Sequence, residues 1–300
     1  MINTKEAYER IKNYIRKTPV IKYKSFYFKL ENLQKSGSFK PRGAYNKILK
    51  NININGVVCA SSGNHAQAVA KACSDLNIKN VKIIVPKNTP EVKINKIRYY
   101  GYEPIFYGEH LNESLNYAKE LARSENLLFV HPYDDLDIIE GQSTIGLEIE
   151  NYDFEYLFIP IGGGGLASGI SIYIKQKKPK VKIYGLVSEN APSFFYSFKS
   201  NKIVKFEPKE TIADGIRLKY PSSLTFKILK ERLEDVILVK EDEIKQAIKW
   251  AYNNLGLILE GAGAISIAVF LFEKLDISSG MFILSGGNIN ESLLDSILRL

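Results

Sequence analysis

Lys40 lies in a sequence that could give a lysine a chemical role. It stands in the small-residue stretch Ser36–Ala44, with Phe39 before it and Pro41 after it. A lysine at a strand-to-helix corner, beside an aromatic ring, can form a Schiff base with a carbonyl compound. From this stretch alone a solvated loop lysine is favoured, because the chain has many lysines. Pro41 is expected to keep Lys40 out of helical dihedral angles and to occupy the first turn of a helix.

A run of four glycines, Gly162–Gly165, lies between a predicted strand and a predicted helix. Backbone N–H groups that no side chain covers can converge on an anion at a helix N-terminus. The run also fits G-x-G-x-x-A through Ala167, and Glu189 lies near the position of a ribose-binding acid, so a dinucleotide site is a rival. Because the unit lies mid-chain and a second glycine turn follows a later strand, a single phosphate group ranks higher.

Two more loops of small and polar residues follow predicted strands. Ser61–His65 offers hydroxyl, amide and N–H groups that suit a substrate carboxylate, although an ordinary helix N-cap explains the serines equally well. His65 alone is most simply a packing or hydrogen-bonding residue. Ser285–Asn288 again opens a helix. One lysine and three such loops suit a carbonyl-bearing cofactor with one phosphate, and pyridoxal phosphate fits every part.

The elements that must position these residues alternate between strands and helices. One series lies within residues 56–134 and a second follows it, which predicts parallel sheets with right-handed crossovers. We therefore predict an α/β fold of two parallel-sheet-containing domains with a cofactor cleft between them. The predicted large, cofactor-binding domain comprises residues 1–55 and 135–300, and the small, substrate-binding domain comprises residues 56–134.

Three segments outside this alternation carry their own predictions. Lys22–Leu30 alternates and is rich in aromatic residues, which predicts one strand. Asn201–Pro221 follows no regular pattern. Ala262–Phe272 is the longest apolar segment, is too short to span a membrane and predicts a buried helix.

The composition limits the classes of function. The chain has 300 residues, of which 45% are hydrophobic and 25% charged, the balance of a soluble globular protein. Its start lacks the apolar core of a signal peptide. Cys59 and Cys73 are the only cysteines and form no C-x-x-C pair, so we expect no zinc ribbon and a cytoplasmic location. The net charge of +8 is spread along the chain without a nucleic-acid-binding pattern, so no nucleic-acid or membrane partner is expected.

Taken together, the motifs resemble those of the serine/threonine dehydratase family of pyridoxal-phosphate enzymes, which has the tryptophan-synthase β-chain fold (fold type II). They follow the family's order over nearly the whole chain. The segments that carry the resemblance are Lys29–Ala44, Ser61–Ala70, His131–Pro132, Gly141–Ile149, Pro160–Leu166, Thr211–Gly215, Glu260–Ala264 and Ser285–Asn288.

The resemblance implies a role for each matched residue. Lys40 would carry the cofactor as a Schiff base, Asn64 would bind its ring hydroxyl, and Ser285 would face its pyridine nitrogen. The glycine run would hold the phosphate. The implied cofactor-binding residues are Phe39, Lys40, Asn64, Gly162, Gly163, Gly164, Gly165, Leu166, Gly215, Glu260 and Ser285. The implied residues of the substrate-carboxylate site are Ser61, Ser62, Gly63, Asn64 and His65.

The resemblance also implies an activity, the β-elimination of L-threonine or L-serine to a 2-oxo acid and ammonia. Lys40 would take the Cα proton, and a neutral Ser285 at the ring nitrogen favours elimination over transamination. Ser62 stands where many threonine dehydratases have alanine and where serine racemases use a serine as the acid/base opposite the lysine. A serine racemase with Lys40 and Ser62 on opposite faces of the substrate is therefore the alternative. A dinucleotide-dependent oxidoreductase and a non-enzymatic phosphometabolite binder are more remote.

The remaining expectations concern metals and partners. Racemase-like members bind a divalent cation through a Glu and a later Asp; Glu189 matches the first, but Phe195 stands at the second, so no metal is predicted. A small amino acid is the expected substrate, and the chain is expected to form a homodimer or homotetramer. The chain ends soon after Ser285, so we expect no C-terminal regulatory domain.

Overall fold

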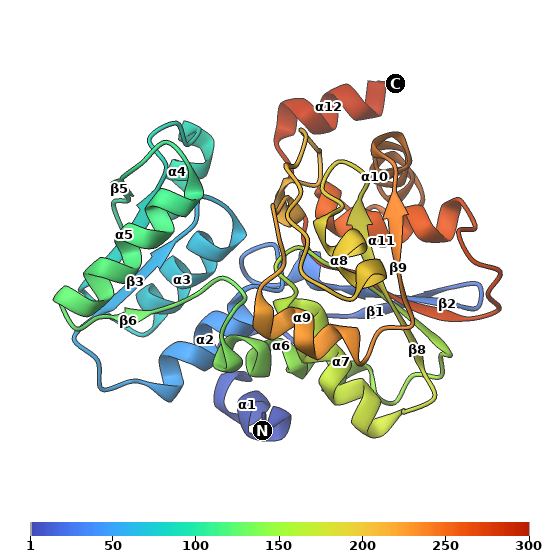
Figure 1. Cartoon of the computed structure of the whole chain (residues 1–300), viewed down its shortest axis with the longest axis horizontal. Helices are drawn as coiled ribbons and strands as arrows, with labels where there is room; N and C mark the ends of the chain where they lie inside the picture. The colour runs from blue at the N-terminus through green and yellow to red at the C-terminus, as the bar shows by residue number, and fades with distance from the viewer. Residues whose placement is uncertain (1, 300) are drawn as a thin grey trace. The chain divides into compact units, whose positions relative to one another are not determined.

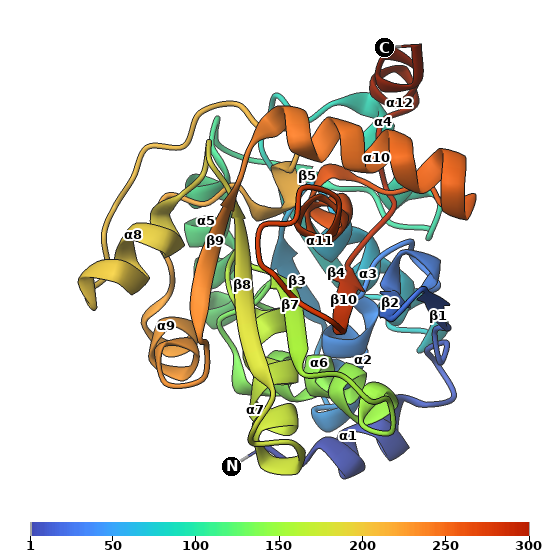
Figure 2. The same ribbon diagram turned by 90° about the vertical axis from the view of Figure 1, so that its right-hand side faces the viewer.

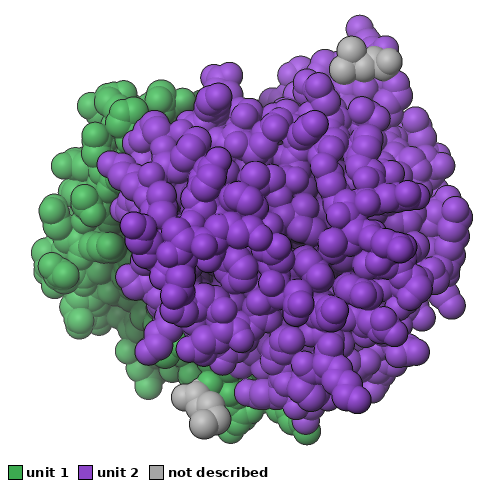
Figure 3. All heavy atoms as spheres, turned by 45° about the vertical axis from the view of Figure 1, so that its right-hand side comes forward, with its two compact units in different colours: residues 1–16, 40–141 green, residues 17–39, 142–300 purple. Residues whose placement is uncertain are grey.

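The computed structural model describes residues 2–299 of the chain. It has an α/β fold, as the alternation predicted, and divides into two compact units (Figure 1). The smaller unit comprises residues 1–16 and 40–141, and the larger comprises residues 17–39 and 142–300 (green and purple in Figure 3). Residues 40–55 group with the smaller unit because helix α2 (Pro41–Lys50) packs on helices α1 (Thr4–Ile11) and α3 (Asn64–Asp75). The sequence-based division placed these residues, and also residues 1–16 and 135–141, with the larger domain.

A four-stranded parallel sheet, in the order β5-β4-β3-β6, forms the centre of the smaller unit. Its strands alternate with helices, and each crossover returns the chain to the same end of the sheet, which makes the pairing parallel. Side chains of β3 alternate between a core with α3 and α4 and a core with α5. The bounds are β3 (Val57–Ala60), β4 (Val81–Val85), α4 (Glu91–Arg98), β5 (Ile105–Phe106), α5 (Leu111–Ser124) and β6 (Leu128–Phe129).

The larger unit contains a six-stranded sheet in the order β1-β2-β10-β7-β8-β9, in which only β1 is antiparallel to its neighbour. Its strands are β1 (Val20–Tyr23), β2 (Phe26–Leu30), β7 (Tyr156–Pro160), β8 (Lys182–Ser188), β9 (Asp235–Val239) and β10 (Gly280–Leu284). Its helices are α7 (Gly165–Lys177), α8 (Ser193–Ser200), α9 (Ser223–Lys230), α10 (Glu241–Leu255), α11 (Gly261–Leu271) and α12 (Glu291–Arg299). Short 3-10 turns are η1 (Glu31–Leu33) and η2 (Asp214–Ile216). Helix α6 (Leu136–Ile149) contains the boundary at residue 141.

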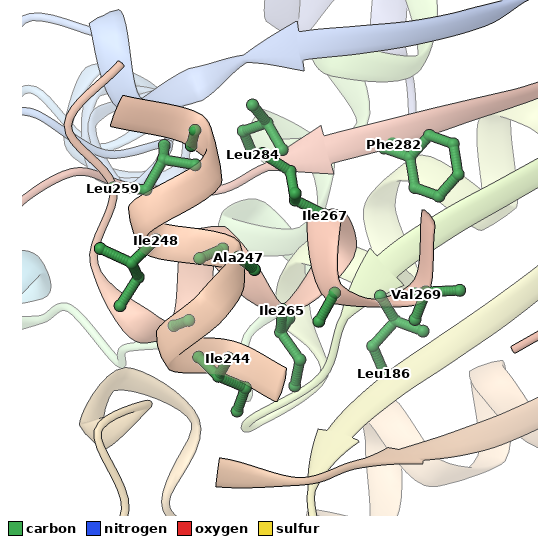
Figure 4. Packing of buried hydrophobic residues seen from close by; sticks show 14 of the residues in the cluster. Leu186, Ile244, Ala247, Ile248, Leu259, Ile265, Ile267, Val269, Phe282 and Leu284 are labelled. Carbon is green, nitrogen blue, oxygen red and sulfur yellow. The ribbon is translucent and has the colours of Figure 1, made fainter. Parts of the chain in front are cut away.

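Two cores cover the two faces of the larger sheet. On β10, Phe282 and Leu284 join the core with α10 and α11, whereas Met281 and Ile283 join the core with α7. This division follows from the two-residue period of a strand. Figure 2 shows α10 and α11 on one side of the sheet and α7 on the other. Figure 4 shows apolar side chains of α11 between those of α10 and the strands.

Helix α11 confirms the prediction of a buried helix at Ala262–Phe272, because nine of its residues are buried. It is too short to cross a membrane, and no other helix in residues 2–299 is both long enough and apolar enough to do so.

Two local predictions are wrong. Lys22–Leu30 is not one strand but the hairpin of β1 and β2, which turns at Lys24 with a φ of 56°. A lysine rarely adopts this left-handed conformation, so its type gave no turn signal. Lys40 is helical, with φ −55° and ψ −34°, and its carbonyl accepts from the N–H of Ala44 at 3.2 Å. The restriction that Pro41 places on Lys40 is a bias, and starting α2 at Pro41 outweighs it.

Candidate active site

Lys40 directly precedes α2 in the smaller unit and is half-buried. Its Nζ donates a hydrogen bond to the backbone carbonyl of Pro132 at 2.9 Å. Pro132 lies in the connection between β6 and α6, directly beyond the end of the smaller sheet. The lysine amine is therefore held at a defined place beside a strand end, where ligands bind in such folds.

The loop Ser61–His65 follows β3 and includes the first two residues of α3 in the same unit. Its first hydroxyl, on Ser61, accepts from the N–H of Gly63 at 3.2 Å. Gly63 caps α3 without any side-chain bond to the helix start, and a Cβ atom added to it would meet nothing within 4 Å. The first N–H groups of a helix lack partners inside the helix and attract anions, so this loop can hold a carboxylate.

His65 is buried and links this loop to the end of β6. Its Nε2 lies 2.8 Å from the carbonyl of Val130, which can only accept, so Nε2 carries the proton. Burial lowers the pKa of His65 to about 3, and the positive charge of Lys40 acts in the same direction. His65 is therefore a neutral donor at physiological pH.

The segment Val130–Pro132 joins the two features. Val130 holds His65, and two residues later Pro132 accepts from Lys40. Between them, His131 is tied to the backbone that follows, because its Nδ1 accepts from the N–H of Asp134 at 2.7 Å. Burial lowers the pKa of His131 to about 4. The smaller unit thus fastens the lysine amine and the serine loop to one short segment.

In the larger unit, the glycine run follows β7 and opens α7. Gly164 has a φ of 84°, and a Cβ atom there would lie 2.8 Å from Cβ of Thr225. A Cβ atom on Gly162 would lie 2.9 Å from Cα of Ile216. No side chain caps α7, so its first N–H groups point to a loop without side chains. This loop fits a phosphate group.

Ser285 follows β10 and is 3% exposed. Its Oγ donates to the carbonyl of Ala262 at 3.0 Å, and its own carbonyl accepts from the N–H of Phe39 at 3.1 Å. Phe39 is the residue before Lys40 in the chain. Gly286, the residue after Ser285, leaves room for the carboxylate of Glu260, because a Cβ atom on Gly286 would lie 2.3 Å from its Oε1.

The predicted site residues thus fall into two groups, each assembled within its own unit. The smaller unit holds Lys40, Ser61, Ser62, Gly63, Asn64 and His65. The larger unit holds Phe39, Gly162, Gly163, Gly164, Gly165, Leu166, Gly215, Glu260 and Ser285. Within the larger unit, Gly215 lies beside both Gly162 and Glu260, which connects the glycine run to the residues around Ser285.

Sequence reasoning missed three groups in this region. The carbonyls of Val130 and Pro132 are backbone atoms, which residue type does not reveal. Glu241 accepts hydrogen bonds from Thr211 and Ile212, but an acid in the first turn of a helix is too ordinary to stand out.

From the sequence, Glu189 is a candidate residue for binding a ribose or a metal ion. Its carboxylate accepts from the N–H of Glu241 at 3.1 Å and so caps α10. Within residues 2–299, no group of three or more His, Cys, Asp or Glu side chains is placed to hold a metal ion.

Comparison with known proteins gives consistent matches over nearly the whole chain. Residues 11–286 match the family described as pyridoxal-phosphate dependent enzyme. The chain is 40% identical to the L-threonine ammonia-lyase of Thermotoga maritima, over 98% of this chain and 77% of that protein. It is 37% identical to the catabolic L-threonine dehydratase TdcB of Escherichia coli strain K12, over 97% and 94%. The solved structure of maize serine racemase is similar with a TM-score of 0.92 and 32% identity, over 99% and 95%.

Proposed function

The chain belongs to the family of pyridoxal-phosphate-dependent enzymes, and we propose that it converts L-threonine or L-serine to a 2-oxo acid and ammonia. It has the fold of type II pyridoxal-phosphate enzymes, and its cofactor is pyridoxal 5′-phosphate. One observation carries the proposal: Lys40 and the loop Ser61–His65 are both fastened to Val130–Pro132. A basic amine is thereby held near a loop that can bind the substrate carboxylate. The names of the two relatives support L-threonine as a substrate.

The residues of each unit fit separate parts of the cofactor. In the smaller unit, Lys40 would bind the aldehyde carbon and Asn64 the ring hydroxyl. In the larger unit, the run Gly162–Leu166 would hold the phosphate, because its N–H groups are uncovered and its glycines leave no room for side chains. Ser285 would face the ring nitrogen. The remaining residues proposed around the ring are Phe39, Gly215 and Glu260.

The bound cofactor supplies a conjugated ring that accepts the electron pair left when a substrate C–H bond breaks. Lys40 Nζ would take the proton from the substrate Cα, and its bond to the Pro132 carbonyl orients the amine. The Ser61–His65 loop would hold the substrate carboxylate at the start of α3. Because His65 is neutral, it fixes this loop without adding a charge.

Ser285 bears on which reaction follows. Its hydroxyl donates to the Ala262 carbonyl at 3.0 Å. Ser285 would therefore offer the ring nitrogen a neutral oxygen and no negative charge. A carboxylate at this position would stabilise a protonated ring nitrogen and a long-lived carbanion. A neutral hydroxyl does so less, which favours rapid loss of the β-hydroxyl over transamination.

The experiment that tests this function measures 2-oxo acid release from L-threonine, L-serine and D-serine by the purified chain loaded with pyridoxal phosphate. We expect 2-oxobutanoate from L-threonine and a visible absorbance band. Lys40→Ala should lose both, whereas Lys35→Ala should keep both, since Lys35 is an exposed lysine directly before Ser36. A chain that shows no band when saturated with the cofactor would refute the proposal.

Serine racemisation is a second candidate, favoured by one feature of the smaller unit. Ser62 is half-buried and directly precedes Gly63, the N-cap of α3, in the segment proposed to hold the substrate carboxylate. A hydroxyl at this position could donate a proton to the substrate Cα from the face opposite Lys40. The similarity to maize serine racemase supports this candidate.

The proposal includes assembly into a homodimer or homotetramer, as the resemblance of the sequence implies. Light scattering of the purified chain separates these masses from that of a monomer. It also includes a cytoplasmic location, supported by Cys59 and Cys73, which are both buried and not joined in a disulfide.

A further inference from the structure

Glu241 has a carboxylate that binds three donors in the larger unit. Its Oε1 accepts from the hydroxyls of Ser188 at 2.5 Å and Thr211 at 2.7 Å. Its Oε2 accepts from the backbone N–H of Ile212 at 2.9 Å. Two of the three donors belong to the connection between α8 and α9, which has no regular structure except the turn η2. Glu241 therefore anchors an otherwise irregular segment.

One part of this connection, the segment Thr211–Ile216, packs against the glycine run. At its start it presses on α11, because a Cβ atom on Gly261 would lie 2.3 Å from the carbonyl oxygen of Ile212. At its end it presses on Gly162, where an added Cβ atom would lie 2.9 Å from Cα of Ile216 and 3.2 Å from the carbonyl oxygen of Gly215. A shift of the segment would therefore be transmitted to the loop that follows β7.

The carboxylate of Glu241 is not needed to cap α10. The N–H of Glu241 is already bound by Glu189 at 3.1 Å, and the N–H of Lys240 by the side chain of Glu243 at 2.9 Å. The start of the helix thus has its own acceptors. The side chain of Glu241 is directed at Ser188, at the end of β8, and at the irregular segment.

We propose that Glu241 is a positioning residue for the phosphate of the cofactor. By holding Thr211–Ile216 against Gly162, it sets the place at which the N–H groups of Gly162–Leu166 converge. This inference rests on the proposed function, because the phosphate in question is that of pyridoxal phosphate. Loosening the segment should weaken binding of the phosphate and leave the binding of the ring and aldehyde nearly unchanged.

Glu241→Gln is the direct test. Glutamine has the same shape but carries no charge and only one acceptor oxygen, so it cannot accept from both the N–H of Ile212 and the hydroxyls of Ser188 and Thr211 as the carboxylate does. The full-length chain is stripped of cofactor and titrated with pyridoxal phosphate and, separately, with pyridoxal, which lacks the phosphate. We expect the affinity for pyridoxal phosphate to fall about tenfold, equal to about 1.4 kcal/mol of binding free energy, and that for pyridoxal to stay constant.

Asp242→Asn is the matched control. It removes the same charge from the same helical turn, at an exposed position whose carboxylate pairs only with Lys245 in the described part of the chain. We expect its ratio of affinities for the two ligands to equal that of the unaltered chain. An equal loss of both affinities in Glu241→Gln, or an equal change of the ratio in Asp242→Asn, would overturn the inference.

Thr211 provides a second test should Glu241→Gln not fold. Thr211→Val removes one hydrogen bond to Glu241 and should lower the affinity for pyridoxal phosphate relative to that for pyridoxal. Thr211→Ser keeps the hydroxyl and should keep the ratio of the unaltered chain. An unaltered chain that does not bind pyridoxal phosphate refutes the proposed function and this inference with it. An unaltered chain that binds normally, with unchanged ratios in both variants, refutes only the role of Glu241.

Discussion

Replacing Gly164 with alanine tests the phosphate loop where its backbone is most constrained. Gly164 has a φ of 84°, and an added Cβ atom would lie 2.8 Å from Cβ and 2.9 Å from Oγ1 of Thr225. Thr225 is fully buried, and its hydroxyl lies 2.8 Å from that of Ser222, so it has little room to move. The substitution therefore has two separate costs, a backbone term and a contact term.

The two costs can be estimated and separated. An L-residue in the left-handed conformation costs about 1–2 kcal/mol. Crowding a packed site typically costs a further ~1–3 kcal/mol. Gly256 isolates the first term, because its φ is 64° and an added Cβ atom would meet nothing within 4 Å. Gly256→Ala should therefore lower the free energy of unfolding by about 1–2 kcal/mol and Gly164→Ala by about 2–5 kcal/mol.

Trp250 makes the measurement specific to the larger unit. It is the only tryptophan of the chain and lies on α10, so its fluorescence during urea denaturation reports the unit that contains both glycines. The same proteins are then titrated with pyridoxal phosphate. If the loop shifts to relieve the contact with Thr225, the affinity should fall about tenfold or more in Gly164→Ala, at 1.4 kcal/mol per factor of ten. Gly256→Ala should bind normally.

Equal losses of stability in the two alanine variants would refute the contact term. An unchanged affinity for pyridoxal phosphate in Gly164→Ala would refute the placement of the phosphate on this loop. Either outcome can occur without the other, so the two measurements test the packing at Gly164 and the placement of the phosphate independently.

Two further predictions concern the smaller unit. Because the pKa of His65 is lowered to about 3 from 6.5, the folded chain keeps it neutral while the unfolded chain protonates it below pH 6.5. The contribution of neutral His65 to the free energy of unfolding is fully present above pH 6.5. It is lost as the pH falls toward 3, by about 2 kcal/mol between pH 7 and pH 5. His65→Asn should remove that part of the loss, measured by hydrogen exchange of α3 amides at both pH values; an unchanged pH dependence would contradict the assignment. Ser62→Ala should abolish any conversion of L-serine to D-serine and spare 2-oxobutanoate release, and loss of both would contradict the role proposed for Ser62.

Local pattern was sufficient for most elements of the fold. The run Val57–Ala60 is apolar throughout, and the structure buries it as a central parallel strand. Helix α5 extends from Leu111 to Ser124 along an uninterrupted amphipathic pattern of its residues. Hydrophobic periodicity and turn residues act within a few positions, so they can be recognised without any knowledge of distant contacts.

Long-range pairing decided what local pattern did not. Strand β2 pairs with β10, more than 240 residues later, which assigns residues 17–39 to the larger unit. The turn at Lys24 exists because β1 folds back on β2, although lysine has no preference for that conformation. Neither feature has a signal in the residues that form it.

For the candidate site, the sequence by itself determined the chemical types: one lysine, one glycine run and two polar loops at strand ends. Only the tertiary structure decided that the amine of Lys40 donates to the carbonyl of Pro132, and that Glu241 binds the segment Thr211–Ile216 that packs against Gly162. The reason is physical. Residue type limits which groups can donate, accept or fit, whereas the partner of each group depends on backbone atoms and on residues far away in the chain, which packing alone brings together.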